Sequence, residues 1–246
     1  MKRMNPKGKI AFVSGANRGI GKAITLELLN QGVEKIYAGA RSLETLKELE
    51  AQYSGRIVPV QLDVTDEASI HLASKSIDKL DILVNNAGVF AVGGVLADSA
   101  IESMKTNLDV NVWGVLKLSN ALLPQLKSSK ESAIVNISSV AGLGNMPMAG
   151  TYSVSKAAVH SMTQGMRAEL AENGTLVMGV YPGPIDTDMA AGLEMDKDSP
   201  EQVALAVVNG LQSGVEDMFP DVMSTEVGAY YSKDPKAIEK QFGTFA

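Results

Sequence analysis

Short runs of apolar residues recur along the chain, and longer segments with helical spacing separate them. The runs are 9–14, 35–40, 56–62, 81–85, 133–137 and 176–181, with 217–220 as a weaker seventh. Most are apolar almost throughout rather than alternating, which is typical of strands that helices cover on both faces. This pattern predicts an α/β fold, doubly wound around a central parallel sheet of about seven strands. No linker or repeat divides the chain, so we expect one domain over residues 1–246.

Start and stop signals mark helices between these runs. Ser99 and Glu102 have the spacing of a capping box. An apolar stripe continues behind them at helical spacing, with Ile101, Met104, Leu108, Val112 and Val115. A later helix has Ser199 as its N-cap, Gln202 as the reciprocal cap and Gly214 just past its end.

The composition is that of an ordinary globular protein. The chain has 246 residues, of which 45% are hydrophobic and 20% charged, and this excludes a disordered or fibrous protein. It contains no cysteine, which excludes a disulfide scaffold, a thiolate metal site and a cysteine nucleophile. Its two histidines, His71 and His160, leave no cluster for a metal site. We expect both to be structural, with His160 on a helix surface.

Charge and hydropathy limit which partners and which cellular compartment we expect for the protein. The 22 basic and 28 acidic residues give a formal net charge of −6. Without a basic block interleaved with aromatic residues, this charge argues against nucleic-acid binding. No apolar run approaches the roughly 18 residues of a membrane-spanning helix, and the run at 10–13 is too short for a secretory signal. We therefore expect a cytoplasmic protein that binds neither nucleic acid nor membranes.

The first strand runs directly into a glycine-rich turn, S-G-A-N-R-G-I-G at 14–21, and then into a helix at 22–30 closed by Gly32. Strand, turn and helix N-terminus in this order place unpaired backbone N–H groups and the positive end of the helix dipole where a pyrophosphate binds. A plain glycine-rich turn has the same composition, so the alternative of a purely structural turn stays open. The candidate residues are Gly15, Asn17, Arg18, Gly19, Ile20 and Gly21.

The spacing Gly-x-x-x-Gly-x-Gly resembles the glycine motif of the short-chain dehydrogenase/reductase family, with Ser14 where threonine is commoner. Further motifs follow in the order of that family over about residues 9–189. They are Asp63-Val64, Asn85-Asn86-Ala87-Gly88, Asn111, Ser138-Ser139, Tyr152-x-x-x-Lys156, Pro182-Gly183 and Thr187. Each lies at the end of a predicted strand or on the next helix, where open α/β sheets bind ligands.

The resemblance implies a Rossmann-type domain that binds a nicotinamide dinucleotide. Asn85, Asn86, Ala87 and Gly88 would line its adenosine side, and Ile185 with Thr187 would hold the carboxamide. The remaining cofactor-binding residues that the resemblance implies are Asp63, Val64, Tyr152, Lys156, Pro182 and Gly183.

The end of the second strand bears on the choice between NAD and NADP. Ala40 stands where an acidic residue would favour NAD, and Arg41 can pair with a phosphate. Arg18 in the glycine turn would add a second positive charge, and we expect no carboxylate to oppose the two cations. We therefore hypothesise NADP(H) as the cofactor. The alternative for Arg41 alone is an exposed residue at a helix entry.

Tyr152 and Lys156 are four residues apart in a segment with helical spacing, so both side chains lie on one helix face. A phenol has a pKa near 10, and a neighbouring ammonium group favours its phenolate. In the family that the chain resembles, the tyrosine is the acid/base and the lysine lowers its pKa and binds the nicotinamide ribose. The resemblance also implies that Ser139, rather than Ser138, holds the substrate oxygen and that Asn111 holds a water of the proton relay.

The expected activity is hydride transfer between NADP(H) and a carbonyl or secondary alcohol carbon, with Tyr152 supplying the proton during reduction. Two alternatives remain: a nucleotide-dependent epimerase or dehydratase, and a non-catalytic dinucleotide sensor. The loops at 89–95, 142–150 and 189–198 are mostly apolar and should bound the substrate pocket. They predict an uncharged or weakly polar carbonyl substrate, with Met146 and Met148 near it.

The resemblance further implies a homo-oligomer, a dimer or tetramer. It would assemble through the long helices that start near Ile101 and Thr151.

Overall fold

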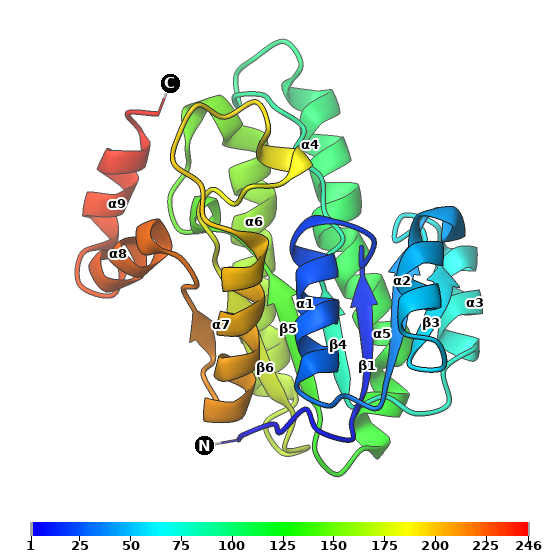
Figure 1. Ribbon diagram of the computed structural model, residues 1–246. Helices are drawn as coiled ribbons and strands as arrows, with labels where there is room; N and C mark the ends of the chain where they lie inside the picture. Colours follow the sequence, from blue (N-terminus) through cyan, green and yellow to red (C-terminus); the bar gives the residue numbers. More distant parts are fainter. Residues whose placement is uncertain (1, 246) are drawn as a thin grey trace.

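The computed structural model describes residues 2–245. In this part of the chain seven parallel strands form one sheet, in the order β3-β2-β1-β4-β5-β6-β7 (Figure 1). The strands are β1 (Ile10–Ser14), β2 (Lys35–Ala40), β3 (Ile57–Gln61), β4 (Ile82–Asn85), β5 (Ala133–Ile137), β6 (Leu176–Val180) and β7 (Asp217–Met218). Every predicted run contains one of these strands, so the predicted doubly wound parallel sheet is confirmed.

Helices cover both faces of this sheet (Figure 1). The buried side chains of α1 (Gly19–Asn30), α2 (Lys47–Gln52), its preceding 3₁₀ turn η1 (Leu43–Leu46) and α7 (Pro200–Ser213) form one core layer. A second layer on the other face contains side chains of α3 (Glu67–Lys75), α5 (Gly114–Ser128) and the C-terminal part of α6 (Gly150–Glu169). Strands buried from both sides explain the continuous apolar runs of the sequence.

Strand β1 lies at the point where the winding of the chain reverses. It pairs with β2 on one side and with β4 on the other. In open α/β sheets the crevice outside the carboxyl ends of the strands at such a point is where ligands bind. The connection between β6 and α7, yellow in Figure 1, extends over this edge of the sheet.

A pair of C-terminal helices, which the sequence analysis did not identify, packs beside the end of the sheet that carries β7. They are α8 (Val222–Tyr231) and α9 (Pro235–Phe242), orange and red in Figure 1. Their apolar side chains form a third cluster whose buried members are Val140, Val227, Ile238 and Phe242. Because Val140 follows β5, this cluster joins the helix pair to the region where the predicted site residues gather.

Helix α7 is capped as predicted at both ends, with one difference. Ser199 Oγ accepts a hydrogen bond from the Gln202 backbone N–H at 3.2 Å, and Gly214 at the C-cap has φ +76°. The prediction of a reciprocal side-chain cap is wrong, because the amide of Gln202 donates instead to the Pro220 carbonyl at 3.3 Å.

The predictions for helix α4 (Ala100–Leu108) are wrong in two respects. Ser99 has helical backbone angles and its side chain makes no capping hydrogen bond. The predicted apolar stripe faces the core only at its end: Ile101 is 85% exposed, Met104, Leu108 and Val112 are partly buried, and Val115 is buried. In α4 itself the buried residues are Ser103 and Asn107. The physical reason is that the loop after β4 packs on α4 and needs polar partners for its backbone: Ser103 Oγ donates to the Val92 carbonyl at 3.0 Å.

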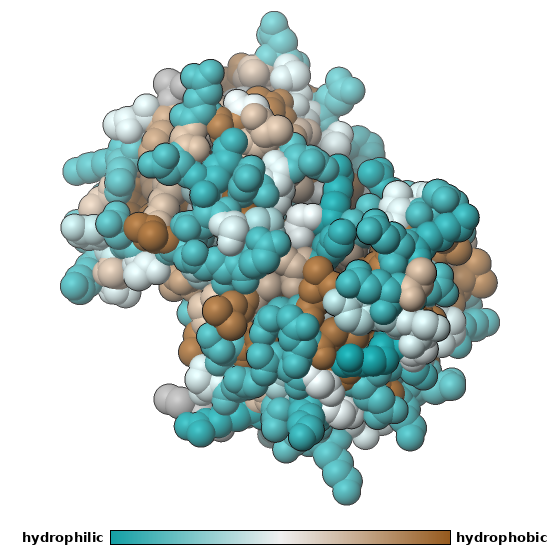
Figure 2. Space-filling model, in the orientation of Figure 1, coloured by the Kyte–Doolittle hydropathy of each residue, from teal (hydrophilic) through white to brown (hydrophobic). Residues whose placement is uncertain are grey.

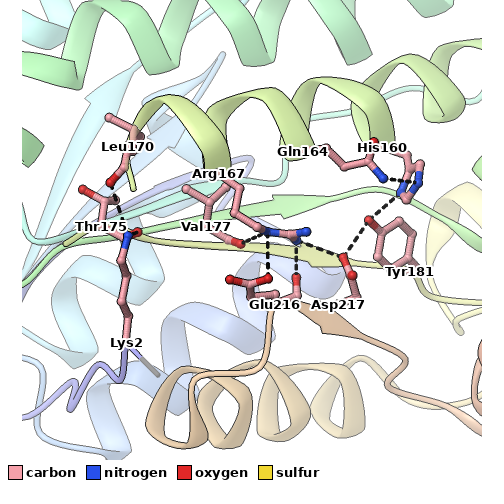
Figure 3. A network of polar contacts seen from close by, with 10 residues as sticks. All are labelled: Lys2, His160, Gln164, Arg167, Leu170, Thr175, Val177, Tyr181, Glu216 and Asp217. Atoms are coloured by element: carbon pink, nitrogen blue, oxygen red, sulfur yellow. Dashed lines mark hydrogen bonds and ion pairs between the residues drawn. The ribbon is translucent and has the colours of Figure 1, made fainter. Parts of the chain in front are cut away.

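A network of hydrogen bonds and ion pairs connects α6 to β6 and β7, at the edge of the sheet that β7 forms (Figure 3). Tyr181 is buried, and its hydroxyl lies 2.7 Å from His160 Nδ1 and donates to Asp217 Oδ1 at 3.2 Å. Arg167 continues the network, with its Nη2 2.9 Å from Asp217 Oδ1. His160 is therefore a half-buried structural residue and not the helix-surface residue that the sequence suggested.

None of the helices in residues 2–245 is long and apolar enough to cross a membrane.

Candidate active site

A cleft of ≈ 570 Å³ lies over the carboxyl ends of β1 to β4. It joins a smaller pocket of ≈ 180 Å³, with which it shares Ile20, Asn86, Gly88, Val89, Thr187 and Met189. The predicted cofactor residues that line the cleft are Gly15, Asn17, Arg18, Gly19, Ile20, Arg41, Asp63, Val64, Asn86, Ala87, Gly88 and Thr187. The predicted residues that line the pocket include Ser139, Tyr152, Lys156, Pro182, Gly183 and Ile185. Three predicted residues, Gly21, Asn85 and Asn111, line neither cavity.

The glycine turn has the backbone that its sequence predicts. Gly15 and Gly19 have φ +66° and +52°, a region that side chains with a Cβ rarely adopt. Helix α1 begins at Gly19, and its N-cap residue Arg18 makes no side-chain capping bond. The first N–H groups of α1 are therefore left for a ligand in the cleft.

Gly21 lies against the glycine turn and does not line the cleft. A Cβ atom at this position would lie 2.1 Å from the Gly15 carbonyl oxygen. Its lack of a side chain is what allows α1 to approach the turn.

Ser14 and Asn86 hold the glycine turn in place by hydrogen bonds. The backbone N–H groups of Asn86 and Ala87 each donate to Ser14 Oγ at 3.0 Å. In return, Asn86 Nδ2 donates to the Ser14 carbonyl at 2.9 Å and to the Gly15 carbonyl at 3.2 Å. The hydroxyl of Ser14 thus couples the end of β4 to the glycine turn.

Asn85 does not lie on the adenosine side as predicted. It is buried, and its Nδ2 donates to Ser119 Oγ at 2.9 Å and to Asn136 Oδ1 at 2.8 Å. The cause is that successive side chains along a strand point to opposite faces of the sheet. Asn85, the last residue of β4, points towards α5, and the next residue, Asn86, lines the cleft.

The two arginines predicted at the cleft are both there, but carboxylates accompany them. Arg18 Nη1 lies 2.9 Å from Asp188 Oδ2, and both side chains are exposed. The pKa of Asp63 is held below its usual value, chiefly by hydrogen bonds from Thr65 and to a smaller extent by the charge of Arg41. The expectation that no carboxylate opposes the cations is therefore wrong. The sequence could not indicate this pairing, because Arg18 and Asp188 are 170 residues apart.

Tyr152 and Lys156 lie on one face of α6, as their spacing predicts. Lys156 Nζ is 5.6 Å from the centroid of the Tyr152 ring and donates to the Ile137 carbonyl at 2.9 Å. Ser139 and Tyr152 line the same pocket, and Ser139 Oγ donates to the Pro182 carbonyl at 3.3 Å. Ser138 instead donates to the Lys156 carbonyl at 3.0 Å. The hydroxyl of Ser138 is thus engaged with the backbone of α6, while Ser139 lines the pocket that contains the phenol.

Burial dominates the electrostatics of this group. It raises the pKa of Tyr152 to about 12, against the smaller lowering by the Ser139 hydroxyl. It also lowers the pKa of Lys156 to about 8. Desolvation disfavours the charged form of each group. The expected lowering of the Tyr152 pKa is therefore wrong for the chain by itself, and the phenol is neutral at physiological pH.

Asn111 lies behind the pocket, in a π-helical turn over Asp109–Trp113 that joins α4 to α5. It is 1% exposed, so the alternative of an exposed asparagine is excluded. Its Oδ1 accepts from the Val89 N–H at 2.8 Å, while its Nδ2 donates to the Val89 carbonyl and to Ser155 Oγ, each at 3.0 Å. π-Helical turns occur frequently at functional sites.

Sequence analysis missed a second asparagine with the same geometry. Asn107 Oδ1 accepts from the Ala91 N–H at 3.0 Å, and its Nδ2 donates to the Ala91 carbonyl at 2.9 Å. Between the two clamped residues, Phe90 packs edge-on against Tyr152 with ring centroids 4.9 Å apart. The i, i+4 spacing of Asn107 and Asn111 could have indicated this pair.

Two further pocket residues were also missed, Met223 of α8 and Phe245 beyond α9. No local pattern marks them, because only the folded chain brings the C-terminal helices to this pocket.

Comparisons with known proteins agree with this fold. The family model described as short chain dehydrogenase matches residues 9–198. An uncharacterized oxidoreductase of Staphylococcus saprophyticus is 34% identical over 214 residues, covering 83% of this chain and 91% of the relative. Another, from Staphylococcus aureus, is 33% identical over 210 residues, covering 82% and 90%.

Among solved structures, dehydrogenases share this fold. A short chain dehydrogenase from Burkholderia cenocepacia, in complex with NADP, is 33% identical with a TM-score of 0.91, covering 97% of this chain and 99% of that one. A closed form of serine dehydrogenase complexed with NADP+ is 28% identical with a TM-score of 0.75, covering 80% and 87%.

Proposed function

This chain belongs to the short-chain dehydrogenase family, and from this premise we propose that it transfers a hydride between NADP(H) and the carbon of a carbonyl or secondary alcohol group. The observation that carries the proposal is the meeting of Tyr152, Lys156 and Ser139 in a pocket that opens into the nucleotide-sized cleft. A positioned acid/base group beside a dinucleotide site is what carbonyl reduction requires.

The cleft fits a dinucleotide on structural grounds. The positive φ angles of Gly15 and Gly19 and the uncapped start of α1 form a cradle for a pyrophosphate. Ile185 and Thr187, in the pocket wall, would hold the carboxamide, and Lys156 would reach the nicotinamide ribose. When bound, NADPH supplies the hydride for the reduction.

Tyr152 holds the proton that reduction consumes. With a pKa of about 12 the phenol is protonated at neutral pH, which is the form that can donate to a developing alkoxide. The Ser139 hydroxyl, which lines the same pocket as the phenol, can hold the substrate oxygen next to it. The mostly protonated Lys156 favours the phenolate that remains after the transfer.

Asn111 would support the return of a proton to Tyr152. It lies close to Lys156, since a Cβ at Gly88 would be 3.2 Å from Asn111 Oδ1 and 3.9 Å from Lys156 Nζ. Because its side-chain amide is engaged with Val89 and Ser155, we assign to Asn111 the placement of this loop beside the relay water.

The preference for NADP(H) rests on Arg41 at the rim of the cleft, with Ser42 and Thr45 beside it. Arg18 can join Arg41 at a 2′-phosphate by leaving its exposed partner Asp188, because an exposed ion pair contributes only about 0–1 kcal/mol. The relatives solved with NADP and NADP+ support this choice.

The test is cofactor oxidation with a panel of ketones and aldehydes. We expect stoichiometric oxidation of NADPH with formation of the alcohol. Recovery of reduced cofactor with an isomerised product would instead indicate an epimerase. Binding of NADPH without turnover across the panel would indicate a sensor.

A further inference from the structure

The pocket beside Tyr152 presents an apolar wall to the substrate. Among its described lining residues, Lys156 is the one side chain that carries a charge at neutral pH, and it is 6% exposed and bound to the Ile137 carbonyl. A carboxylate or phosphate in this pocket would lose its hydration without gaining a free counter-charge. The pocket therefore disfavours charged substrates.

Methionines form much of this wall. Five of the 12 methionines of the chain line the pocket: Met146, Met148, Met189, Met195 and Met223. Met148, Met189 and Met195 are 40%, 47% and 39% exposed, so they stand at its mouth. Methionine side chains adapt to the shape of their neighbours and make favourable contacts with aromatic rings. Such a wall suits hydrocarbon groups of varied shape, aromatic rings included.

The far wall comes from the C-terminus. Phe245 lines the pocket, and its carbonyl accepts a hydrogen bond from the Met148 N–H at 3.2 Å. Its ring packs edge-on against the buried Phe242, with centroids 5.8 Å apart. Phe245 is thus attached to the pocket by its backbone and to α9 by its side chain.

The helix pair that carries this wall is itself anchored to the site. Asp221 is 2% exposed, caps α8 through the Ser224 N–H at 2.8 Å, and accepts from the Gly183 N–H at 2.8 Å. Gly183 also lines the pocket. The position of Phe245 is therefore set by the same residues that shape the active site.

We infer that the substrate is a compact, uncharged ketone or aldehyde with one aromatic ring or a short hydrocarbon chain, and that Phe245 is the residue that limits its size. The volume of ≈ 180 Å³, part of which the nicotinamide would fill, leaves room beside Tyr152 for a small substrate group only. It is below the roughly 300–1,000 Å³ of sites for drug-sized ligands. This inference rests on the proposed function. In the reaction the carbonyl carbon gains a hydride from NADPH, its oxygen gains the proton of Tyr152, and an alcohol and NADP+ result.

The experiment compares three aldehydes with NADPH: 4-methylbenzaldehyde, its charged counterpart 4-carboxybenzaldehyde, and 2-naphthaldehyde. We expect kcat/KM to be at least tenfold higher for the methyl than for the carboxyl compound. In Phe245→Ala we expect the ratio of kcat/KM for the two-ring over the one-ring aldehyde to rise at least tenfold, because one or a few carbons in a pocket change specificity by about 10–200-fold. The matched control is Tyr230→Ala, an exposed ring of α8 outside the pocket, which should leave this ratio unchanged.

Binding of the same aldehydes to the enzyme loaded with NADP+, measured by calorimetry, separates the two claims. Binding that depends on size and on Phe245, without reduction, supports the pocket and contradicts the proposed function. Equal or better use of the carboxyl compound, or an unchanged ratio in Phe245→Ala, overturns the inference.

Discussion

At the scale of single residues, the site is built from groups whose protonation is set by burial. Tyr152 is kept neutral, with its pKa raised to about 12, and Lys156, although its pKa is lowered to about 8, stays mostly charged at pH 7. Each buried group would be more favourably hydrated in the unfolded chain. Active sites commonly hold such residues at a cost in stability.

Replacement of Lys156 by methionine should therefore abolish activity and stabilise the fold at pH 7. A pKa lowered from 10.5 to about 8 corresponds to a cost of up to about 3 kcal/mol for the charged lysine. Loss of its hydrogen bond to Ile137 offsets about 1 kcal/mol of the gain. The free energy of unfolding from urea titrations measures the difference.

The lowered pKa of Lys156 predicts how the stability of the wild type depends on pH. Between pH 8 and 10.5 the unfolded chain binds more protons at this lysine than the folded chain, so the wild type gains stability with rising pH. The excess in the free energy of unfolding of Lys156→Met over the wild type should then be largest below pH 8 and shrink towards pH 10. A variant less stable than the wild type at pH 7 would contradict this account.

At the scale of elements, two asparagines of the α4–α5 segment hold the loop that follows β4. Asn111 clamps Val89 and Asn107 clamps Ala91, each by an N–H and a C=O bond, and Phe90 between them packs on Tyr152. The polar face of α4 thus positions the wall of the active site.

Asn107→Ala leaves the Ala91 N–H without a partner, whereas the Ala91 carbonyl keeps a hydrogen bond from Thr151 Oγ1 at 3.4 Å. We expect a loss of about 1–3 kcal/mol in the free energy of unfolding, which is the usual cost of an unsatisfied buried group. We also expect a lower kcat with an unchanged affinity for NADPH, since the cleft keeps its residues. Asn120→Ala, an exposed asparagine of α5, is the matched control. A stability and kcat equal to those of the wild type would show that the clamp is dispensable.

At the scale of the whole molecule, the strands and the site motifs could be predicted because their signals are local. An apolar run identifies a strand, and the spacing of Tyr152 and Lys156 places both on one helix face. The pairing of Arg18 with Asp188, the inward face of α4 and the wall formed by Phe245 could not be predicted. Each of these depends on contacts between segments far apart in the sequence.

The surface also bears on assembly. The face that carries α1 and α7 is mostly hydrophilic (Figure 2). On the other side of the sheet, α4 and the segment after it expose Ile101 and Trp113 by 85% and 49%. Where such side chains adjoin in one patch, they mark an interaction surface. We therefore propose a dimer or tetramer that assembles through α4, α5 and the start of α6.

Light scattering after size exclusion tests this proposal. The wild type should elute as a dimer or tetramer, and Ile101→Lys should shift it towards the monomer, because a buried ammonium group would lack a partner. Leu72→Lys, a similarly exposed leucine of α3, should leave the assembly unchanged. A monomeric wild type would contradict the proposal.

The central claim is that the hydroxyl of Tyr152 delivers the proton of the reduction. The most direct measurement is the rate of NADPH-dependent carbonyl reduction by Tyr152→Phe, with the dissociation constant of NADPH measured in parallel. The account predicts a fall in kcat of about 10²–10⁴-fold, the usual contribution of a general acid, at an unchanged NADPH affinity. Reduction at the wild-type rate without this hydroxyl would contradict it.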